Sequence, residues 1–357
     1  MTEMGKEIWI DPNAQFCEDI AQTCYADILG SVSQSEIFQR VYALPGLILK
    51  VVGAGHEVAN LLTAAFSHLR ASDYIEAEHE TLTWHIGDVS LISSAPEFPL
   101  LPTGMHELGN FNCSASGHIF IERRSGLVTV YNRKTHIVTS ICDGAGKIEN
   151  DVIAKPLLRF LMGILQLKGI HLAHSALVGL NGKGILVTGK GGKGKSTISS
   201  AALLGGLSFC ADDFVALQRT GTGIVGHSLY ATLLLHENQL PKHPHLRAYC
   251  RRSHSATVPK TVVILAGNFA AQTVQSLAID AITVPHIVAG TASSLQPISR
   301  VEALRALTPT SVFSSPWRSV ETARFLFDLA TELPCYAYHS GSVFEDISQP
   351  VKDRYAK

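Results

Sequence analysis

A glycine-rich segment between two apolar stretches restricts the fold of this chain more than any other feature. Residues 189–196 read Gly-Lys-Gly-Gly-Lys-Gly-Lys-Ser and fit the phosphate-loop pattern G-x-x-x-x-G-K-S. The stretch before it, residues 184–188, predicts a buried strand, and residues 196–204 predict a helix of small and apolar residues. A strand, a glycine turn and a helix in this order predict an α/β sheet with a phosphate site at the start of the helix.

The residue types in this segment suit the binding of a nucleotide. In the glycine loop, residues 189–194, backbone N–H groups can turn toward phosphate oxygens at the positive end of the helix dipole. Lys195 is placed to bind the β- and γ-phosphates of ATP, and the Ser196 hydroxyl to ligate Mg²⁺. The alternative is a glycine-rich turn without a ligand. The candidate ATP-binding residues are Gly189, Lys190, Gly191, Gly192, Lys193, Gly194, Lys195, Ser196 and Thr197.

Two carboxylates follow the next predicted strand. Asp212 and Asp213 come sixteen residues after Ser196, directly behind the apolar residues 207–211. At the carboxyl end of a strand, one of them can hold the metal while the other accepts a proton from an attacking hydroxyl. Neighbouring strand residues point to opposite faces, so both can serve only if the strand ends or turns there. The alternative is a polar strand end that leads into a hairpin.

A histidine upstream makes the pattern specific. His174 lies fifteen residues before Gly189, and a strand, the turn at residues 181–184 and a second strand separate them. With the glycine loop and Ala211-Asp212-Asp213, this order resembles the catalytic domain of the HPr kinase/phosphorylase family. That family phosphorylates a serine on a carrier protein and is related to ATP-dependent phosphoenolpyruvate carboxykinase. The resemblance covers residues 170–220.

The resemblance implies a fold and a role for each matching residue. The fold would be a mixed-sheet α/β kinase domain of the HPr kinase and carboxykinase type. Asp212 would be the general base, Asp213 and Ser196 would hold Mg²⁺, and Lys195 would neutralise the transferred phosphoryl group. His174 would lie near the active site, although a histidine that begins a buried strand is more often structural.

The chain departs from the family pattern in two places. The family's loop commonly reads Gly-Asp-Ser-Gly, whereas this loop carries Lys190 and Lys193. Glu237 lies near the position of a later glutamate in the family, but in a different context. The chain is more similar to the broad group of HPr-kinase-related proteins found beside peptide-modification genes. This implies a peptide or small-protein substrate, such as the precursor of a modified peptide, and allows a homo-oligomer.

Composition excludes several other classes of protein. The chain has 357 residues, of which 46% are hydrophobic and 17% charged, enough for two buried cores. Its net charge of −1 gives no general attraction to nucleic acid. The first residues are polar, and the most apolar predicted helix, residues 157–167, is too short to span a bilayer and contains Arg159. Seven cysteines form no CxxC pair. We expect a cytoplasmic protein without a zinc site or a membrane anchor.

The order of elements predicts two domains. Residues 1–145 would form a small α+β accessory or substrate-recognition domain, and residues 146–357 the catalytic domain. Expected helices lie at residues 14–29, 57–70, 148–167, from 297 onward and at 316–333. Expected strands lie at residues 47–52, 81–86, 119–122, 127–131, 135–139, 214–217, 223–226, 230–235 and 261–265.

One segment of the expected catalytic domain is strongly basic. Residues 238–279 contain no Asp or Glu, and residues 242–259 are rich in Pro and Ser, which predicts a mobile loop. Its cations are Lys242, Arg247, Arg251, Arg252 and Lys260. They are suited to bind the phosphates of ATP or an acidic peptide, and the alternative is a solvated basic surface.

Four functions fit part of this sequence. The first is an ATP- and Mg²⁺-dependent kinase that phosphorylates a hydroxyl, most readily Ser or Thr of a peptide or small protein. The second is an NTPase whose hydrolysis switches a partner, and the third is a nucleotide-sensing module. The doubled aspartate favours transfer over hydrolysis. The fourth, carboxykinase chemistry, would need an extra metal, carboxylate-binding arginines and a longer chain, and the sequence does not show these features.

Overall fold

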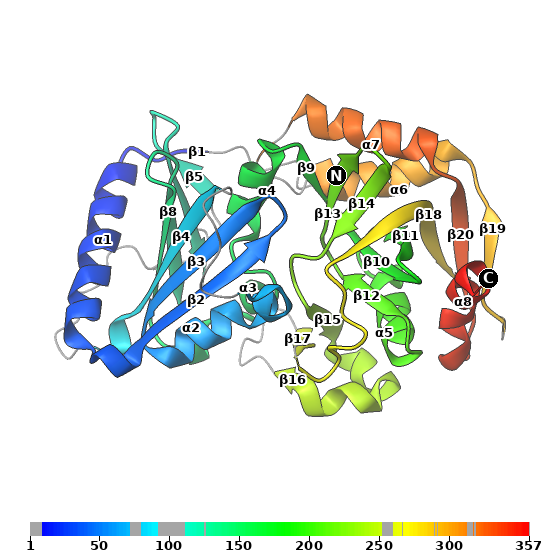
Figure 1. Ribbon diagram of the computed structural model, residues 1–357, viewed down its shortest axis with the longest axis horizontal. Coiled ribbons are helices and arrows are strands. Elements are labelled where there is room, and N and C mark those ends of the chain that lie inside the picture. The colour runs from blue at the N-terminus through cyan, green and yellow to red at the C-terminus, as the bar shows by residue number, and fades with distance from the viewer. Residues whose placement is uncertain are drawn as a thin grey trace. The chain divides into compact units, whose positions relative to one another are not determined.

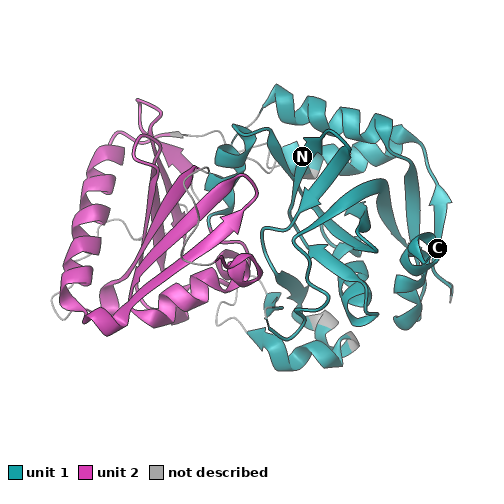
Figure 2. Cartoon of the chain, in the orientation of Figure 1, with its two compact units in different colours: residues 1–5, 157–252, 259–357 teal, residues 6–156, 253–258 magenta. Residues whose placement is uncertain are grey.

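The computed structural model describes most of the chain. The described residues are 9–71, 80–91, 111–124, 126–251, 260–265, 267–288, 290, 292–312, 317 and 319–356. They divide into two compact units, one made of residues 9–156 and the other of residues 157–251 and 260–356 (Figure 2). No helix among the described residues is long and apolar enough to cross a membrane.

The unit of residues 9–156 contains a mixed sheet. Its strands run in the order β1-β5-β6-β7-β8-β4-β3-β2, and β4 is parallel to both β3 and β8. The strands are β1 (Trp9–Ile10), β2 (Ile37–Leu44), β3 (Leu47–Ala54), β4 (Thr81–Asp88), β5 (Phe111–Cys113), β6 (Ile119–Arg124), β7 (Leu127–Asn132) and β8 (Ile137–Cys142). The helical segments are α1 (Ala14–Ser31), η1 (Gln34–Glu36), α2 (His56–Thr63), η2 (Ala64–Leu69), η3 (Val89–Leu91), η5 (Ala145–Lys147) and α3 (Asn150–Ala154).

Helices cover both faces of this sheet (Figure 1). On one face, Tyr25 of α1 stacks on His85 with ring centroids 4.5 Å apart. On the other face, Phe66 of η2 meets Trp84 edge to face. His85 and Trp84 are adjacent in β4, and side chains of a strand alternate between its faces. The expected helix at residues 14–29 and the antiparallel strands at 119–139 are present, and the parallel pairing of β4 with β3 and β8 makes this sheet mixed.

The expected continuous helix over residues 148–167 is wrong. The chain forms α3 (Asn150–Ala154) and α4 (Leu158–Gln166), with a break between them. Pro156 has no N–H to continue the helix, and it disfavours the helical conformation at Lys155, which has φ −141° and ψ 61°. Leu157 then adopts a left-handed φ of 58°. The boundary between the two compact units falls at this break.

The second unit contains a larger mixed sheet. Its strands run in the order β12-β10-β11-β18-β14-β13-β9, with β20 beside β18 and β19 beside β20. They are β9 (Ile170–Ala173), β10 (Ser175–Leu180), β11 (Lys183–Thr188), β12 (Ser208–Ala211), β13 (Val215–Thr220), β14 (Gly223–His227), β18 (Ser276–Ile287), β19 (Ser294–Pro297) and β20 (Cys335–Ser340). A small sheet joins β15 (Thr232–His236), β17 (Lys260–Ile264) and β16 (Cys250–Arg251).

Two helical layers enclose the larger sheet (Figure 1). One face packs on α6 (Arg300–Val312) and α7 (Val320–Glu332) through Leu307 and Leu329. The other face packs on α5 (Lys195–Leu204) and α8 (Gln349–Tyr355) through Ile198 and Val351. Ser319 caps α7 by accepting a hydrogen bond from the Thr322 backbone, so this helix starts later than the expected residue 316.

The basic segment is partly helical. Its described residues form the short helices η6 (Glu237–Lys242) and η7 (Pro244–Tyr249), and β16 then pairs with β17. A further short helix, η8 (Glu345–Ser348), follows β20. The rest of the expected loop over residues 242–259, namely residues 252–259 with Arg252, lies outside the described residues.

Candidate functional site

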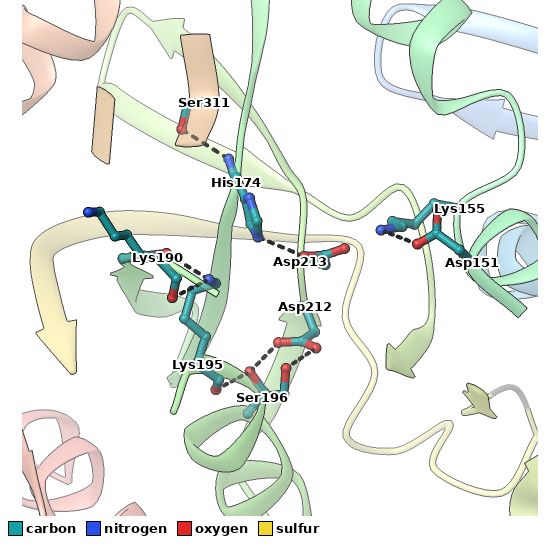
Figure 3. A network of polar contacts seen from close by, with 11 residues as sticks. Asp151, Lys155, His174, Lys190, Lys195, Ser196, Asp212, Asp213 and Ser311 are labelled. Carbon is teal, nitrogen blue, oxygen red and sulfur yellow. Dashed lines mark hydrogen bonds and ion pairs between the residues drawn. The ribbon is translucent and has the colours of Figure 1, made fainter. Parts of the chain in front are cut away.

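The pairing of three strands brings the predicted site residues to one edge of the sheet. Ser175, at the start of β10, pairs with Thr188 at the end of β11, and Leu177 pairs with Ala211 at the end of β12. His174, the glycine loop and the two aspartates therefore leave the sheet side by side (Figure 3). The buried runs fix this register, because a slip of one residue would exchange the side chains that pack against the two helical layers.

The backbone of the loop requires glycine. Gly189, Gly192 and Gly194 have φ values of 147°, 77° and 105°. These conformations strain a residue that carries a Cβ, and glycine adopts them freely. The α-helix α5 then begins at Lys195. The loop consequently turns from strand to helix with its main chain exposed around the helix N-terminus, which is the arrangement that binds anions.

Lys195 is held inside the loop that precedes it. Its side chain is buried, and Nζ donates to the carbonyl oxygen of Gly189 at 2.7 Å and to that of Lys190 at 3.4 Å. These contacts fix a positive charge at the floor of the loop. Lys190 and Lys193 are exposed and do not line the adjoining cavity. Figure 3 shows the Lys190 side chain directed away from both aspartates.

Asp212 is buried and bonded to helix α5. Ser196 Oγ donates to its Oδ2 at 2.9 Å, and Ser199 Oγ donates to its Oδ1 at 3.0 Å. Burial, and then the negative charge of Asp213, raises the pKa of the Asp212 carboxyl to about 6. The two hydroxyls and Lys195 oppose this rise but do not cancel it.

Asp213 turns away from strand geometry. Its φ is 71°, a left-handed value that is uncommon for a residue other than glycine. Because β12 ends at Ala211, the Asp213 carboxylate faces the same cavity as that of Asp212 and lies 2.8 Å from His174 Nε2. Strained backbone of this kind is concentrated at functional sites.

His174 is positioned on three sides. Its backbone N–H donates to Ser311 Oγ at 3.0 Å, and its ring stacks on Phe214 with centroids 5.1 Å apart. Its Nε2 faces the Asp213 carboxylate (Figure 3). The ring therefore has a fixed orientation, and it lines the cavity together with Lys195 and both aspartates.

These groups open into a cavity of about 720 Å³. Thr197, Gly191, Gly192 and Gly194 also line it, whereas Gly189 does not. Of the basic residues that the sequence singles out, Lys260 lines the cavity, beside His236 on the neighbouring strand. Further walls, which sequence reasoning missed, come from Leu234 and Leu235, from the last residues of β18 and β20, and from residues that follow these two strands. The only available signal was that each lies near the end of an apolar strand.

The donor atoms fit a hard divalent cation. Ser196 and the two aspartates offer oxygen atoms, which Mg²⁺ prefers. Among the residues that the structure describes, no three His, Cys, Asp or Glu side chains gather into a metal site. A cation here would therefore need phosphate and water oxygens to complete its coordination, as Mg²⁺ bound with a nucleotide does.

Comparison with known proteins gives little further information. No protein-family model matches the sequence, and no curated protein matches it. Among solved structures, the HPr(Ser) kinase/phosphatase from Coxiella burnetii is similar over 52% of this chain and 97% of its own, with 11% identity and a TM-score of 0.29. A TM-score this low carries no argument about function. We therefore infer function from the residues of the cavity.

Proposed function

We propose that the chain is an ATP- and Mg²⁺-dependent phosphotransferase that moves the γ-phosphoryl group to a hydroxyl, most readily that of Ser or Thr in a peptide or small protein. The observation that carries this proposal is that Asp212 and Asp213 line one cavity with Lys195 and make different contacts. A hydrolase needs one carboxylate beside its metal, whereas a transferase also gains from a group that takes the hydroxyl proton.

The hydrogen bonds favour a division of roles opposite to the one that the family resemblance implies. Ser196 donates to Asp212, and this hydroxyl and carboxylate together are suited to hold Mg²⁺. When bound, the cation would neutralise charge on the phosphates. Asp213 is more exposed and contacts His174, so we assign the proton transfer to this second pair.

The reaction then needs positioning and charge more than covalent chemistry from the protein. The acceptor oxygen forms a bond to the γ-phosphorus while the bond from that phosphorus to the β-phosphate oxygen breaks, which releases ADP. Asp213 takes the hydroxyl proton, and His174 keeps the carboxylate oriented. Lys195 and Lys260, which both line the cavity, offset the negative charge of the phosphoryl group.

The test is an assay for a phosphorylated product. The chain is incubated with ATP, Mg²⁺ and a library of peptides that contain Ser, Thr or Tyr, and mass spectrometry detects the added phosphoryl group. We expect Asp213→Asn to slow transfer by about 100-fold or more, as loss of a general base does, while ATP binding persists. Lys195→Ala should lose both ATP binding and transfer, and the exposed Asp353→Asn should change neither.

The same assay separates the alternatives. ATP turnover that yields only inorganic phosphate with every peptide would favour the NTPase switch. ATP binding without any turnover would favour the nucleotide sensor. Full transfer activity in Asp213→Asn would reject the assignment of the base.

A further inference from the structure

The cavity extends past the glycine loop, away from the carboxylates. The strand pairings place the ends of β12, β10, β11, β18 and β20 in this order along one edge of the sheet. Asp212, Asp213 and His174 lie at the β12 and β10 end of the row. Residues that follow β18 and β20 line the cavity on the opposite side of the loop. A triphosphate on the loop with its γ-phosphate toward the aspartates would direct its nucleoside toward this opposite side.

This opposite side is apolar and open. Ile287 is 75% exposed although it lines the cavity, and Val288, Phe344 and Ile347 line it as well. Large aliphatic side chains exposed on a cavity wall indicate contact with a ligand more than with solvent. Ile287 also lies against the loop, because its Cγ1 is 4.0 Å from the position that a Cβ on Gly194 would take. The apolar wall therefore begins directly beside the phosphate-binding backbone.

Internal hydrogen bonds hold this wall in shape. The Val288 N–H donates to the Ser340 carbonyl oxygen at 3.1 Å, and the Gly341 N–H donates to Ser293 Oγ at 3.0 Å. The Ser342 N–H donates to the Gly290 carbonyl oxygen at 2.8 Å. These backbone N–H groups are thus committed to the fold. Ser340 and Ser342 also line this end of the cavity, and its other lining side chains are apolar. A preformed apolar surface of this kind suits the flat face of a heterocyclic base.

We propose that Ile287, Val288 and Phe344 form the nucleobase subsite, and that the base packs against the Ile287 side chain. The proposal rests on the proposed nucleotide function and adds the residues that bind the nucleoside end. Among the described residues, none of those that line the cavity beside Ile287, Val288 and Phe344 has an ionised side chain. Lys195 and Lys260 line other parts of the cavity. Binding of the base is therefore insensitive to salt, and binding of the phosphates weakens as salt rises.

The test compares ATP with inorganic triphosphate, which lacks the nucleoside. Calorimetry with Mg²⁺ measures the affinity of the full chain, of Ile287→Ser and of Val320→Ser. Val320 is 72% exposed on α7 and does not line the cavity, so it is the matched control. We expect wild type to bind ATP more tightly than triphosphate, and Ile287→Ser to weaken ATP by about tenfold while triphosphate affinity is unchanged. Val320→Ser should resemble wild type.

The outcomes separate the two proposals. If ATP binds wild type no more tightly than triphosphate, or if Ile287→Ser weakens both ligands equally, the nucleobase subsite is wrong and the phosphate site stands. If neither ligand binds wild type, the nucleotide function fails and this inference fails with it. Retained triphosphate binding in Ile287→Ser also shows that the variant is folded.

Discussion

Replacing Asp212 with asparagine should make the metal-free protein more stable at neutral pH, although it removes a site residue. The carboxyl is buried, and its pKa is raised from 3.8 to about 6. Asparagine has nearly the same shape and no charge, and the Ser196 and Ser199 hydroxyls that donate to Asp212 can also accept from an amide. The variant therefore keeps the hydrogen bonds and avoids burying a negative charge.

The pKa shift sets the size and the pH range of the effect. The folded protein binds the proton more tightly than the unfolded chain, whose carboxyl has the ordinary pKa of 3.8. Stabilisation from the protonated Asp212 is therefore complete below pH 3.8 and is lost as the pH rises through about 6. A shift of about 2 pKa units at 1.36 kcal/mol each amounts to about 3 kcal/mol. The unfolding free energy of the Asp212→Asn variant should thus exceed that of wild type by about this amount at pH 8.

Hydrogen exchange of the α5 amides measures the stabilising free energy in the helix that Asp212 contacts. Two compact units can unfold separately, so a single global transition does not report on one of them. The opening free energy of the α5 amides is compared between pH 4 and pH 8 in the presence of a chelator, for wild type, Asp212→Asn and the exposed control Asp353→Asn. Equal protection in wild type and Asp212→Asn at pH 8, or a gain of the same size at pH 4, would refute the reasoning.

Substitutions of Gly192 and Gly163 test the backbone strain of the glycine loop and the packing around α4, each with a second glycine as its control. Gly192 has a φ of 77°, so Gly192→Ala should destabilise the nucleotide-free protein by about 1–2 kcal/mol, measured by hydrogen exchange of the α5 amides. Gly191→Ala, at a position where no atom of the described residues lies near the added Cβ, should cost less, and equal costs would contradict the strain. A Cβ at Gly163 would overlap the Trp317 ring, so Gly163→Ala should destabilise its unit by about 1–3 kcal/mol. Gly30→Ala, in an uncrowded helix position, should stabilise by about 0.5–1 kcal/mol, and a shift of the same sign for both would contradict the packing.

Local patterns in the sequence were enough to predict the elements around the glycine loop. The strand at residues 183–188 and the helix from Lys195 follow from an apolar run, glycines and small residues that are contiguous in the chain. The same locality explains one error. An apolar run suggested a helix across residues 148–167, but Pro156 lacks the N–H that continuity requires.

The two aspartates show where local reasoning ends. The sequence by itself placed Asp212 and Asp213 at a strand end, and it left open whether both could face one cavity. Only the fold decides this, because Asp213 adopts a left-handed conformation and its carboxylate contacts His174, a residue 39 positions away. The rise in the pKa of Asp212 likewise depends on burial by the whole unit.

The residues that line the opposite side of the cavity, away from the aspartates, could be identified only from the tertiary structure. Ile287 and Phe344 are ordinary apolar residues in sequence, and nothing in their neighbours separates them from core residues. β18, which ends at Ile287, pairs in parallel with β11, and β20, which precedes Phe344, pairs in parallel with β18. These strands are far apart in the chain. A sequence motif can be recognised because its residues lie close together in the chain. The residues that line a pocket come from distant segments, which only tertiary packing brings together.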